Sequence, residues 1–368
     1  MTTDVGKKYG VYIHIPFCKA KCKYCAFVST PDFSLQKSYV SALLGEINRC
    51  QLKGSDVDSI YIGGGTPSCL YSGGIAEILT AVKNNFNVLS DAEITVECNP
   101  ESVDDAFADE CKESGVNRIS MGLQSQCTVV LLASGRIHTL EQYKTAIDIL
   151  SRRFDNISSD IILGLPLQDI SDIEQSLNLM TELKHVSVYA LSVEQGTPLY
   201  TEGYSVDDDM IADFYDCACK KLIGMGFYRY EVSNFAKIGY ESRHNNKYWN
   251  CMPYIGFGVA AHGYDGKRTR YKHGDDISEY ICSPVAESYL LTDRDMYNEY
   301  VMLRLRTERG IAIDEFKKRF GYDFCERNAD ILNKLQSEGL IVCADGAVKI
   351  APDRLYVMNS IIEQLMLD

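Results

Sequence analysis

Three cysteines near the N-terminus are the residues of this sequence best suited to metal chemistry. Cys18, Cys22 and Cys25 are spaced C-x3-C-x2-C and follow a short apolar stretch, Tyr12–Ile15. A four-iron cubane cluster normally takes four cysteine ligands, so three thiolates on one loop would leave one iron open. Zinc is the alternative, but structural zinc sites usually include a second cysteine or histidine pair, which does not follow here. The spacing therefore favours an iron–sulfur cluster that takes part in chemistry.

The segments around this loop alternate short β-branched runs with amphipathic stretches, which is typical of a parallel α/β sheet. The predicted strands are Gly10–Ile15, Asp58–Ile62, Glu93–Glu97, Arg118–Met121, Ser159–Leu163 and Val186–Leu191. The predicted helices are Ser34–Leu52, Ile75–Phe86, Val103–Ser114, Leu140–Arg152 and Ile173–Leu183. Six β/α units predict an α/β fold, an incomplete TIM-like (β/α)6 barrel rather than the full eightfold form.

Polar or glycine-rich motifs lie at the carboxyl ends of the predicted strands. They are Gly63–Pro67, Glu97–Pro100, Gly122–Ser125 and Gly164–Gln168, with Asp160 inside the fifth strand. Sites in barrels of this class are built from loops at the carboxyl ends of the strands, so these motifs should share one rim with the cysteines. Each also has a simpler interpretation, such as a tight turn for the glycines or a helix cap for the glutamate. Together they predict one site.

The cysteine spacing, with the aromatic Tyr24 just before Cys25, resembles the radical S-adenosylmethionine (SAM) superfamily. In that superfamily the open iron binds the amino and carboxylate groups of SAM, and one electron from the cluster splits SAM to give a 5′-deoxyadenosyl radical. The resemblance implies a [4Fe-4S] cluster, SAM and an electron donor for the cluster, while the protein supplies binding, orientation and exclusion of water.

Motifs along nearly the whole chain resemble the family of oxygen-independent coproporphyrinogen oxidases and their relatives. They are His14–Cys18, Gly63–Pro67, Glu97–Pro100, Ser120–Ser125, Gly135–His138, Gly164–Gln168, Ser187–Leu191, Glu194–Pro198 and Tyr230–Ala236. By this resemblance the expected SAM contacts are Tyr12, Tyr24, Gly64, Gly65, Thr66, Glu97, Gln124, Arg136 and Asp160. Without the resemblance, Arg136 would be interpreted as a surface residue.

Three features favour the heme chaperone branch of this family over its oxidases. Phe27 stands where the oxidases have a further cysteine, and the cluster loop begins at Cys18 without a long preceding extension. The third feature is the H-N-x-x-Y-W motif at His244–Trp249, which that branch links to heme binding. The resemblance implies heme as cargo and heme-accepting proteins as partners, and no catalytic residue is assigned. The alternatives are an enzyme that decarboxylates or methylates a porphyrin, and a cluster that serves only structure or dimerisation.

The region 227–272 has the composition expected for a flat, apolar, anionic ligand. Aromatic residues suited to stacking on a porphyrin alternate there with Arg243, Lys247, Lys267, Arg268, Arg270 and Lys272, which suit its propionates. The candidate heme contacts are His244, Tyr248 and Trp249, and His262 is a second candidate axial ligand. The simpler interpretation is a solvated hairpin at Tyr264–Arg268 and a histidine that is a structural hydrogen-bond hub. A cysteine or another residue also remains possible as the ligand.

From residue 291 the pattern changes, which predicts two domains, 1–290 and 291–368. The predicted C-terminal elements are helices Asp293–Arg306, Ile313–Phe320 and Asp323–Glu338, a hairpin Leu340–Ile350 and a final helix Arg354–Leu367. This order predicts a small helical, winged-helix-like domain. Its 11 Lys and Arg against 14 Asp and Glu give a balance of −3, which argues against DNA binding. Ala351–Arg354 departs from the stretch usual in the family at this position.

Composition bounds the remaining possibilities. The 368 residues carry a net charge of −14, which argues against a nucleic-acid partner. No apolar run is long enough for a transmembrane helix, and Met1–Lys8 lacks the apolar core of a signal peptide, so a cytoplasmic location is expected. The 14 cysteines fit that location, because those outside the cluster loop are scattered as expected for reduced thiols.

Overall fold

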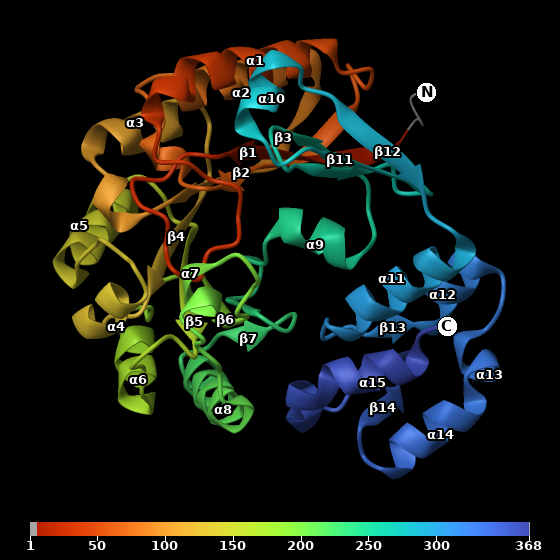
Figure 1. Cartoon of the computed structure of the whole chain (residues 1–368). Helices are drawn as coiled ribbons and strands as arrows, with labels where there is room; N and C mark the ends of the chain where they lie inside the picture. The colour runs from red at the N-terminus through yellow and green to blue at the C-terminus, as the bar shows by residue number, and fades with distance from the viewer. Residues whose placement is uncertain (1–5, 368) are drawn as a thin grey trace.

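A computed structural model of the chain describes residues 6–367, and its centre is a curled sheet (Figure 1). The six strands of the predicted barrel are β1 (Lys8–Ile15), β2 (Asp56–Gly64), β3 (Asn87–Cys98), β4 (Arg118–Gln124), β5 (Ile157–Leu163) and β6 (His185–Ala190). Each pairs in parallel with the next, which confirms the predicted α/β fold. The signal-peptide expectation rests mainly on residues 1–5, which lie outside the described part of the chain.

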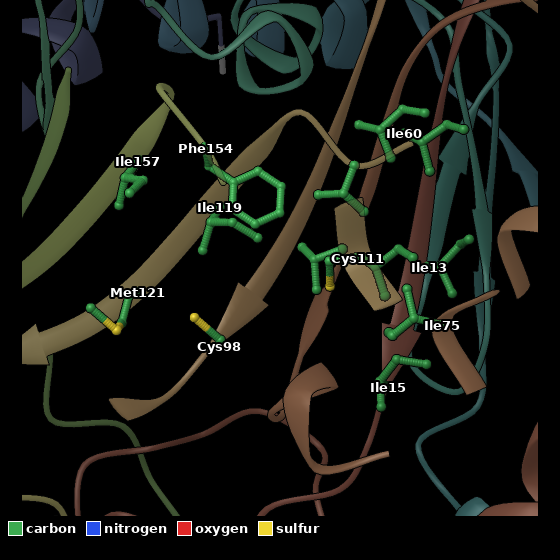
Figure 2. Close-up of a cluster of buried hydrophobic side chains, with 14 of the residues drawn as sticks. Ile13, Ile15, Ile60, Ile75, Cys98, Cys111, Ile119, Met121, Phe154 and Ile157 are labelled. Carbon is green, nitrogen blue, oxygen red and sulfur yellow. The ribbon is translucent and has the colours of Figure 1, made fainter. Parts of the chain in front are cut away.

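Helices cover the outer face of this sheet (Figure 1). They are α1 (Gln36–Arg49), α2 (Gly74–Asn85), α3 (Asp105–Glu113), α4 (Thr128–Ala133), α5 (Leu140–Ser151), α6 (Ile170–Asn178) and α8 (Asp208–Gly224). The short helix α7 (Pro198–Thr201) lies at the rim instead, where the Leu199 amide donates to the Lys23 carbonyl at 3.1 Å. Alternate strand residues such as Ile13, Ile60 and Ile119 point toward these helices and are fully buried in the main core (Figure 2). The strands alternate in this way because successive side chains point to opposite faces of a sheet.

The other face of the strands lines the barrel interior and carries polar side chains. Ser59, Thr95, Arg118 and Ser158 occupy these inward positions and are almost completely buried. Buried polar groups require hydrogen-bond partners, so an interior of this kind favours polar ligands over further apolar packing. The same alternation that buries the isoleucines therefore prepares a polar cavity.

The sheet is extended at both edges beyond the six predicted strands. Its full order among the described residues is β12-β11-β10-β9-β1-β2-β3-β4-β5-β6-β8-β7. The added strands are β7 (Tyr228–Arg229), β8 (Asn234–Ala236), β9 (Tyr254–Phe257), β10 (His262–Tyr264), β11 (Thr269–His273) and β12 (Ala286–Leu290). β10 and β11 form the hairpin expected around Tyr264–Arg268. Two further helices, α9 (Arg243–Trp249) and α10 (Ile277–Cys282), lie between these strands in the sequence.

The C-terminal residues build a separate, mostly helical core beside the barrel (Figure 1). Its elements are α11 (Asp293–Leu305), β13 (Ile311–Ala312), α12 (Ile313–Phe320), α13 (Phe324–Arg327), α14 (Ala329–Ser337), β14 (Ile341–Ala344), β15 (Ala347–Ile350), the 3-10 helix η4 (Pro352–Val357) and α15 (Met358–Leu365). The predicted hairpin is confirmed by the antiparallel pairing of β14 with β15. No helix in the described part of the chain has the length and apolar character needed to cross a membrane.

Two C-terminal helices that were predicted to be continuous are interrupted in the structure. The helix expected over Asp323–Glu338 is interrupted at Asn328, whose backbone angles (φ −108°, ψ 20°) are not helical. The Asn328 side chain donates to the Phe324 carbonyl, a local hydrogen bond that competes with the regular helical pattern. The helix expected over Arg354–Leu367 begins as the 3-10 turn η4, and α15 starts only at Met358.

Candidate functional site

A cavity of about 480 Å³ opens at the carboxyl ends of the barrel strands. All three cluster-loop cysteines and eight of the nine expected SAM contacts line it: Cys18, Cys22, Cys25, Tyr24, Gly64, Gly65, Thr66, Glu97, Gln124, Arg136 and Asp160. Residues from β2 to β6 contribute to the wall, as expected for a site at this end of a barrel. Its volume is within the range of small-molecule and cofactor sites.

The cysteine loop is tied to the rim by backbone hydrogen bonds. The Cys18 amide donates to the Thr30 carbonyl at 3.1 Å, which joins the two ends of the loop, and the Lys23 amide donates to the Ser134 carbonyl at 3.0 Å. All three thiols are half-buried. Among residues 6–367, no three histidine, cysteine or acidic side chains form a group that could hold one metal ion. Three half-buried thiols on a loop fixed to the rim are therefore available as metal ligands at the cavity.

Gly64 and Gly65 allow the end of β2 to pack closely against the end of β1, which leads into the cysteine loop. Gly64 has φ 108°, a conformation that strongly favours glycine, and a Cβ there would lie 2.5 Å from the His14 ring. A Cβ on Gly65 would lie 2.8 Å from the Ile15 carbonyl oxygen, to which the Gly65 amide also donates. The next residue continues the contact, because Thr66 Oγ1 lies 3.3 Å from Cys18 Sγ. Gly64, at the end of β2, and Gly65 after it are therefore part of the cavity wall.

Arg136 connects the cysteine loop to the strand ends. Its Nη2 donates to Asn99 Oδ1 and to the Gly122 carbonyl, each at 2.9 Å, and its Nη1 lies 3.8 Å from Cys22 Sγ. Its Nε donates to His138 Nδ1 at 3.2 Å. Only 7% of Arg136 is exposed, so the simpler interpretation of it as a surface residue was wrong. A cation held this firmly at the cavity wall can bind a carboxylate or balance the charge of thiolates.

Two side-chain oxygens in the cavity wall are buried without a hydrogen-bond partner among the described residues. They are Gln124 Oε1 and Asp160 Oδ1. Gln124 has φ 67° and sits at a break in the β4–β5 register between Gly122 and Gln124, so the strand bends there. A buried acceptor without a partner is costly, and strained residues of this kind concentrate at ligand sites. These atoms therefore fit a ligand with hydroxyl or amino donors, as the ribose and amino groups of SAM would supply.

Glu97 is a third acceptor in the same wall. Its carboxylate accepts from Tyr61 Oη at 2.7 Å and from the Gly64 amide at 3.0 Å. Burial raises the pKa of Glu97 to about 7, although the hydrogen bonds from Tyr61 and Gly64 oppose that shift. At neutral pH this carboxyl group can therefore exchange a proton or ionise in response to a nearby cationic ligand.

The raised pKa of Glu97 predicts that this side chain destabilises the folded protein increasingly as the pH rises. Since the folded-state pKa of about 7 lies above the ordinary value of 4.5, the unfolded state loses its proton first as the pH rises. We expect Glu97→Gln to gain stability relative to the unsubstituted chain between pH 5 and pH 8, by up to about 3 kcal/mol. Denaturant unfolding at both pH values measures this, with the exposed Glu113→Gln as control. Equal pH dependence of Glu97→Gln and the unsubstituted chain would contradict the prediction.

Tyr12 is the one expected SAM contact that does not line the cavity. Its hydroxyl is 3.1 Å from His14 Nδ1, and its ring stacks on Tyr61 with the centroids 6.3 Å apart. Because Tyr61 donates to Glu97, Tyr12 supports the wall from below. Sequence reasoning missed Asn99, Ser120 and Tyr189 as lining residues, although each stands beside a quoted motif residue or within a quoted motif. The alternation of these residues with apolar neighbours was the sequence signal that could have identified them as facing the barrel interior.

The structure places His244 away from this cavity, in the amino-terminal half of the barrel. It is fully buried, and its Nδ1 and Nε2 lie 3.0 Å from Ser59 Oγ and 2.8 Å from Tyr248 Oη. Burial lowers the pKa of His244 to about 3, so the ring is neutral. With both nitrogens bonded, His244 is the structural hub of the simpler interpretation, and direct ligation of heme iron would require α9 to leave its place.

The bases expected to receive heme propionates are mostly paired with acids of the chain itself. Four of these pairs are Arg243 with Asp91, Lys247 with Asp58 at 2.6 Å, Arg270 with Glu299 at 2.6 Å and Lys272 with Asp275 at 3.3 Å. Arg268 pairs with Asp293. An arginine or lysine that already has a carboxylate partner has less to gain from a propionate. Ion pairing within the protein therefore accounts for most bases of the region 227–272. His262, the second candidate axial ligand, is exposed on β10.

Comparison with known sequences agrees with the resemblance. The Radical SAM superfamily profile matches residues 12–180, and the HemN C-terminal domain profile matches residues 291–352. The chain is 34% identical over 370 residues to the heme chaperone HemW of Bacillus subtilis, covering 95% of this chain and 97% of that protein. It is 33% identical over 377 residues to the heme chaperone HemW of Escherichia coli, covering 96% and 97%.

Among solved structures, the coproporphyrinogen III oxidase HemN of Escherichia coli has the same fold. The TM-score is 0.84 over 98% of this chain and 90% of that one, at 19% identity. At that identity the likeness establishes the fold alone, and it includes the helical C-terminal part. The sequence relatives supply the closer relationship, because they cover nearly the full length of this chain at more than 30% identity. The chain therefore belongs to the HemW family of the radical SAM superfamily.

Proposed function

We propose that this chain is a heme chaperone that carries a [4Fe-4S] cluster on Cys18, Cys22 and Cys25, binds SAM in the adjoining cavity and delivers heme to acceptor proteins. The observation that supports it best is the meeting of a three-thiol loop with a cavity whose wall holds unpartnered acceptors. The full-length similarity to proteins named heme chaperone HemW supports heme as the cargo.

The residues of the cavity have complementary tasks in this proposal. The three thiolates would hold three irons and leave the fourth iron without a protein ligand. Arg136 offers a fixed cation, while Glu97, Gln124 and Asp160 offer acceptors for the amino and hydroxyl groups of SAM. When both are bound, a reduced cluster and SAM supply 5′-deoxyadenosyl radical chemistry.

Phe27 favours a chaperone over a coproporphyrinogen oxidase. It lines the same cavity with 64% of its surface exposed, at the position where the oxidases have a further cysteine. A phenyl ring can neither ligate a metal nor transfer a proton, so this position offers only an apolar contact. The alternative, an enzyme acting on a porphyrin, would need its proton donors from elsewhere on the rim.

The proposal is tested on protein reconstituted anaerobically with iron and sulfide. We expect about one heme per chain in a spectroscopic titration, and no decarboxylation of coproporphyrinogen III when SAM and a reductant are present. Formation of 5′-deoxyadenosine is measured in parallel, with and without the porphyrin. Multiple-turnover decarboxylation, or 5′-deoxyadenosine that depends on the porphyrin substrate, would establish the enzymatic alternative instead.

A further inference from the structure

A second cavity lies away from the cysteine loop, between α8 and the segment that precedes α15. It has a volume of about 450 Å³ and is bounded by α8, the β7–β8 hairpin and the 3-10 helix η4. Figure 1 shows α8 and α15 on facing sides of the boundary between barrel and C-terminal part. None of its lining residues belongs to the cavity with the cysteine loop, so it is an independent site.

The wall of this second cavity is largely apolar and aromatic. Its aromatic members are Tyr215, Phe227, Tyr228, Phe235 and Tyr356. Ile223 and Tyr356, on opposite sides, are 61% and 62% exposed, so the cavity mouth is open to solvent. Phe227 and Phe235 are 3% and 0% exposed and support the wall from behind, so Tyr215, Tyr228 and Tyr356 supply the accessible aromatic surface. Such surface around an open, apolar slot suits a flat, unsaturated ligand that keeps one edge accessible.

A smaller cavity of about 140 Å³ adjoins the aromatic one and adds cationic side chains. The two share Arg229, Glu308, Pro352 and Leu355 as lining residues. Arg229 is paired with Glu308 at 3.0 Å. The smaller cavity is also lined by Arg306 and Lys349.

Arg306 and Lys349 differ from the five paired bases of the region 227–272 in having no acidic partner among the described residues. Arg306 donates to Asn359 Oδ1 at 2.8 Å and contacts the Met302 carbonyl, and no carboxylate among residues 6–367 pairs with it or with Lys349. Burial lowers the pKa of Arg306 below the ordinary arginine value. A half-buried guanidinium without a counter-charge has the most to gain from an anionic ligand.

We propose that the two joined cavities are the cargo site, with the porphyrin plane of heme in the aromatic cavity and its propionates toward Arg306 and Lys349. This inference rests on the proposed chaperone function and adds its location. It explains how SAM and heme can be held at once, because the cysteine-loop cavity stays free for SAM. It also leaves one heme edge at the open mouth, where an acceptor protein can reach it.

The aromatic cavity is tested by filling it. Ala212 lines the cavity from α8, so Ala212→Trp should occupy the space of the porphyrin and weaken heme binding about tenfold or more. The matched control is Lys220→Trp, an exposed position on the same helix that does not line the cavity. Thermal unfolding of both variants checks that they fold. Heme affinity of Ala212→Trp equal to that of Lys220→Trp would overturn the location.

The cationic end is tested with Arg306→Gln combined with Lys349→Gln. Iron-free protoporphyrin IX should bind this double variant about tenfold more weakly than the unsubstituted chain. Protoporphyrin IX dimethyl ester, which lacks the two carboxylates, should bind both proteins equally. An equal loss for acid and ester would overturn the propionate assignment. Failure of the unsubstituted protein to bind any heme would overturn the chaperone function itself, whereas normal heme binding by all variants would overturn only the site.

Discussion

Serine in place of Cys18, Cys22 or Cys25 is expected to reduce the iron content of the anaerobically reconstituted protein from about four atoms per chain to less than about one. The three thiols share one loop at the cavity, so each substitution would remove one of the three protein ligands of the proposed cluster. A cluster left with two protein ligands is exposed to solvent and breaks down. The same variants should lose measurable SAM binding, since SAM chelates the open iron in this superfamily.

Iron, sulfide and zinc analysis of each variant measures the effect, and isothermal titration with SAM measures the second consequence. The control is Cys282→Ser, because Cys282 is an exposed thiol on α10, outside the cavity. It should retain iron and SAM affinity. Retention of full iron by the cluster-loop variants, or stoichiometric zinc in the unsubstituted protein, would contradict the cluster assignment.

The position of the site was predictable from sequence because each of its motifs follows a strand. Parallel strands end at one rim, so Gly64, Glu97 and Gln124 had to meet once the strand pattern was identified. Their types then limit the chemistry, since glycine permits close approach and the other two offer acceptors. The wall position of Arg136 was not predictable in this way. It lies in the loop after α4, and only the resemblance made it an expected SAM contact; the structure shows that its side chain turns back to Asn99 and Cys22.

The region after residue 227 was harder to predict because its structure depends on distant partners. The spacing of His244 and Tyr248 shows that they face each other on a helix, but not that Ser59 and Glu93 receive that helix inside the barrel. Likewise, the bases of this region appear free in the sequence, and their acidic partners come from other elements. Arg306 and Lys349 could be identified as cations without an acidic partner only from the ion pairs of the described residues 6–367. Whether a basic side chain is free to bind an anionic ligand therefore depends on which acidic residues the fold places beside it.

Arg136→Lys is expected to weaken SAM binding about a hundredfold while iron content stays near that of the unsubstituted protein. The guanidinium makes hydrogen bonds in divergent directions, to Asn99, the Gly122 carbonyl and His138, in addition to its contact with Cys22 Sγ. A lysine ammonium has the same charge but cannot reach these partners together. A cation displaced from the wall would forfeit its charge-assisted hydrogen bonds to the SAM carboxylate, and two such bonds of about 1.5 to 3 kcal/mol each correspond to at least about a hundredfold in affinity.

The charge-conserving change separates geometry from charge, which makes it more informative than removal of the side chain. If Arg136 acted only as a counter-charge for the thiolates, Arg136→Lys would bind SAM normally. That result would contradict the claim that SAM binding depends on the geometry of the guanidinium. Arg153→Lys is the matched control, because Arg153 makes its ion pairs with Asp105 and Asp109 on the outer surface. It should change SAM affinity less than about threefold, since surface ion pairs contribute little. Retained iron in Arg136→Lys would show that the cysteine loop still folds, so a loss confined to SAM would locate the role of Arg136 at the cavity wall.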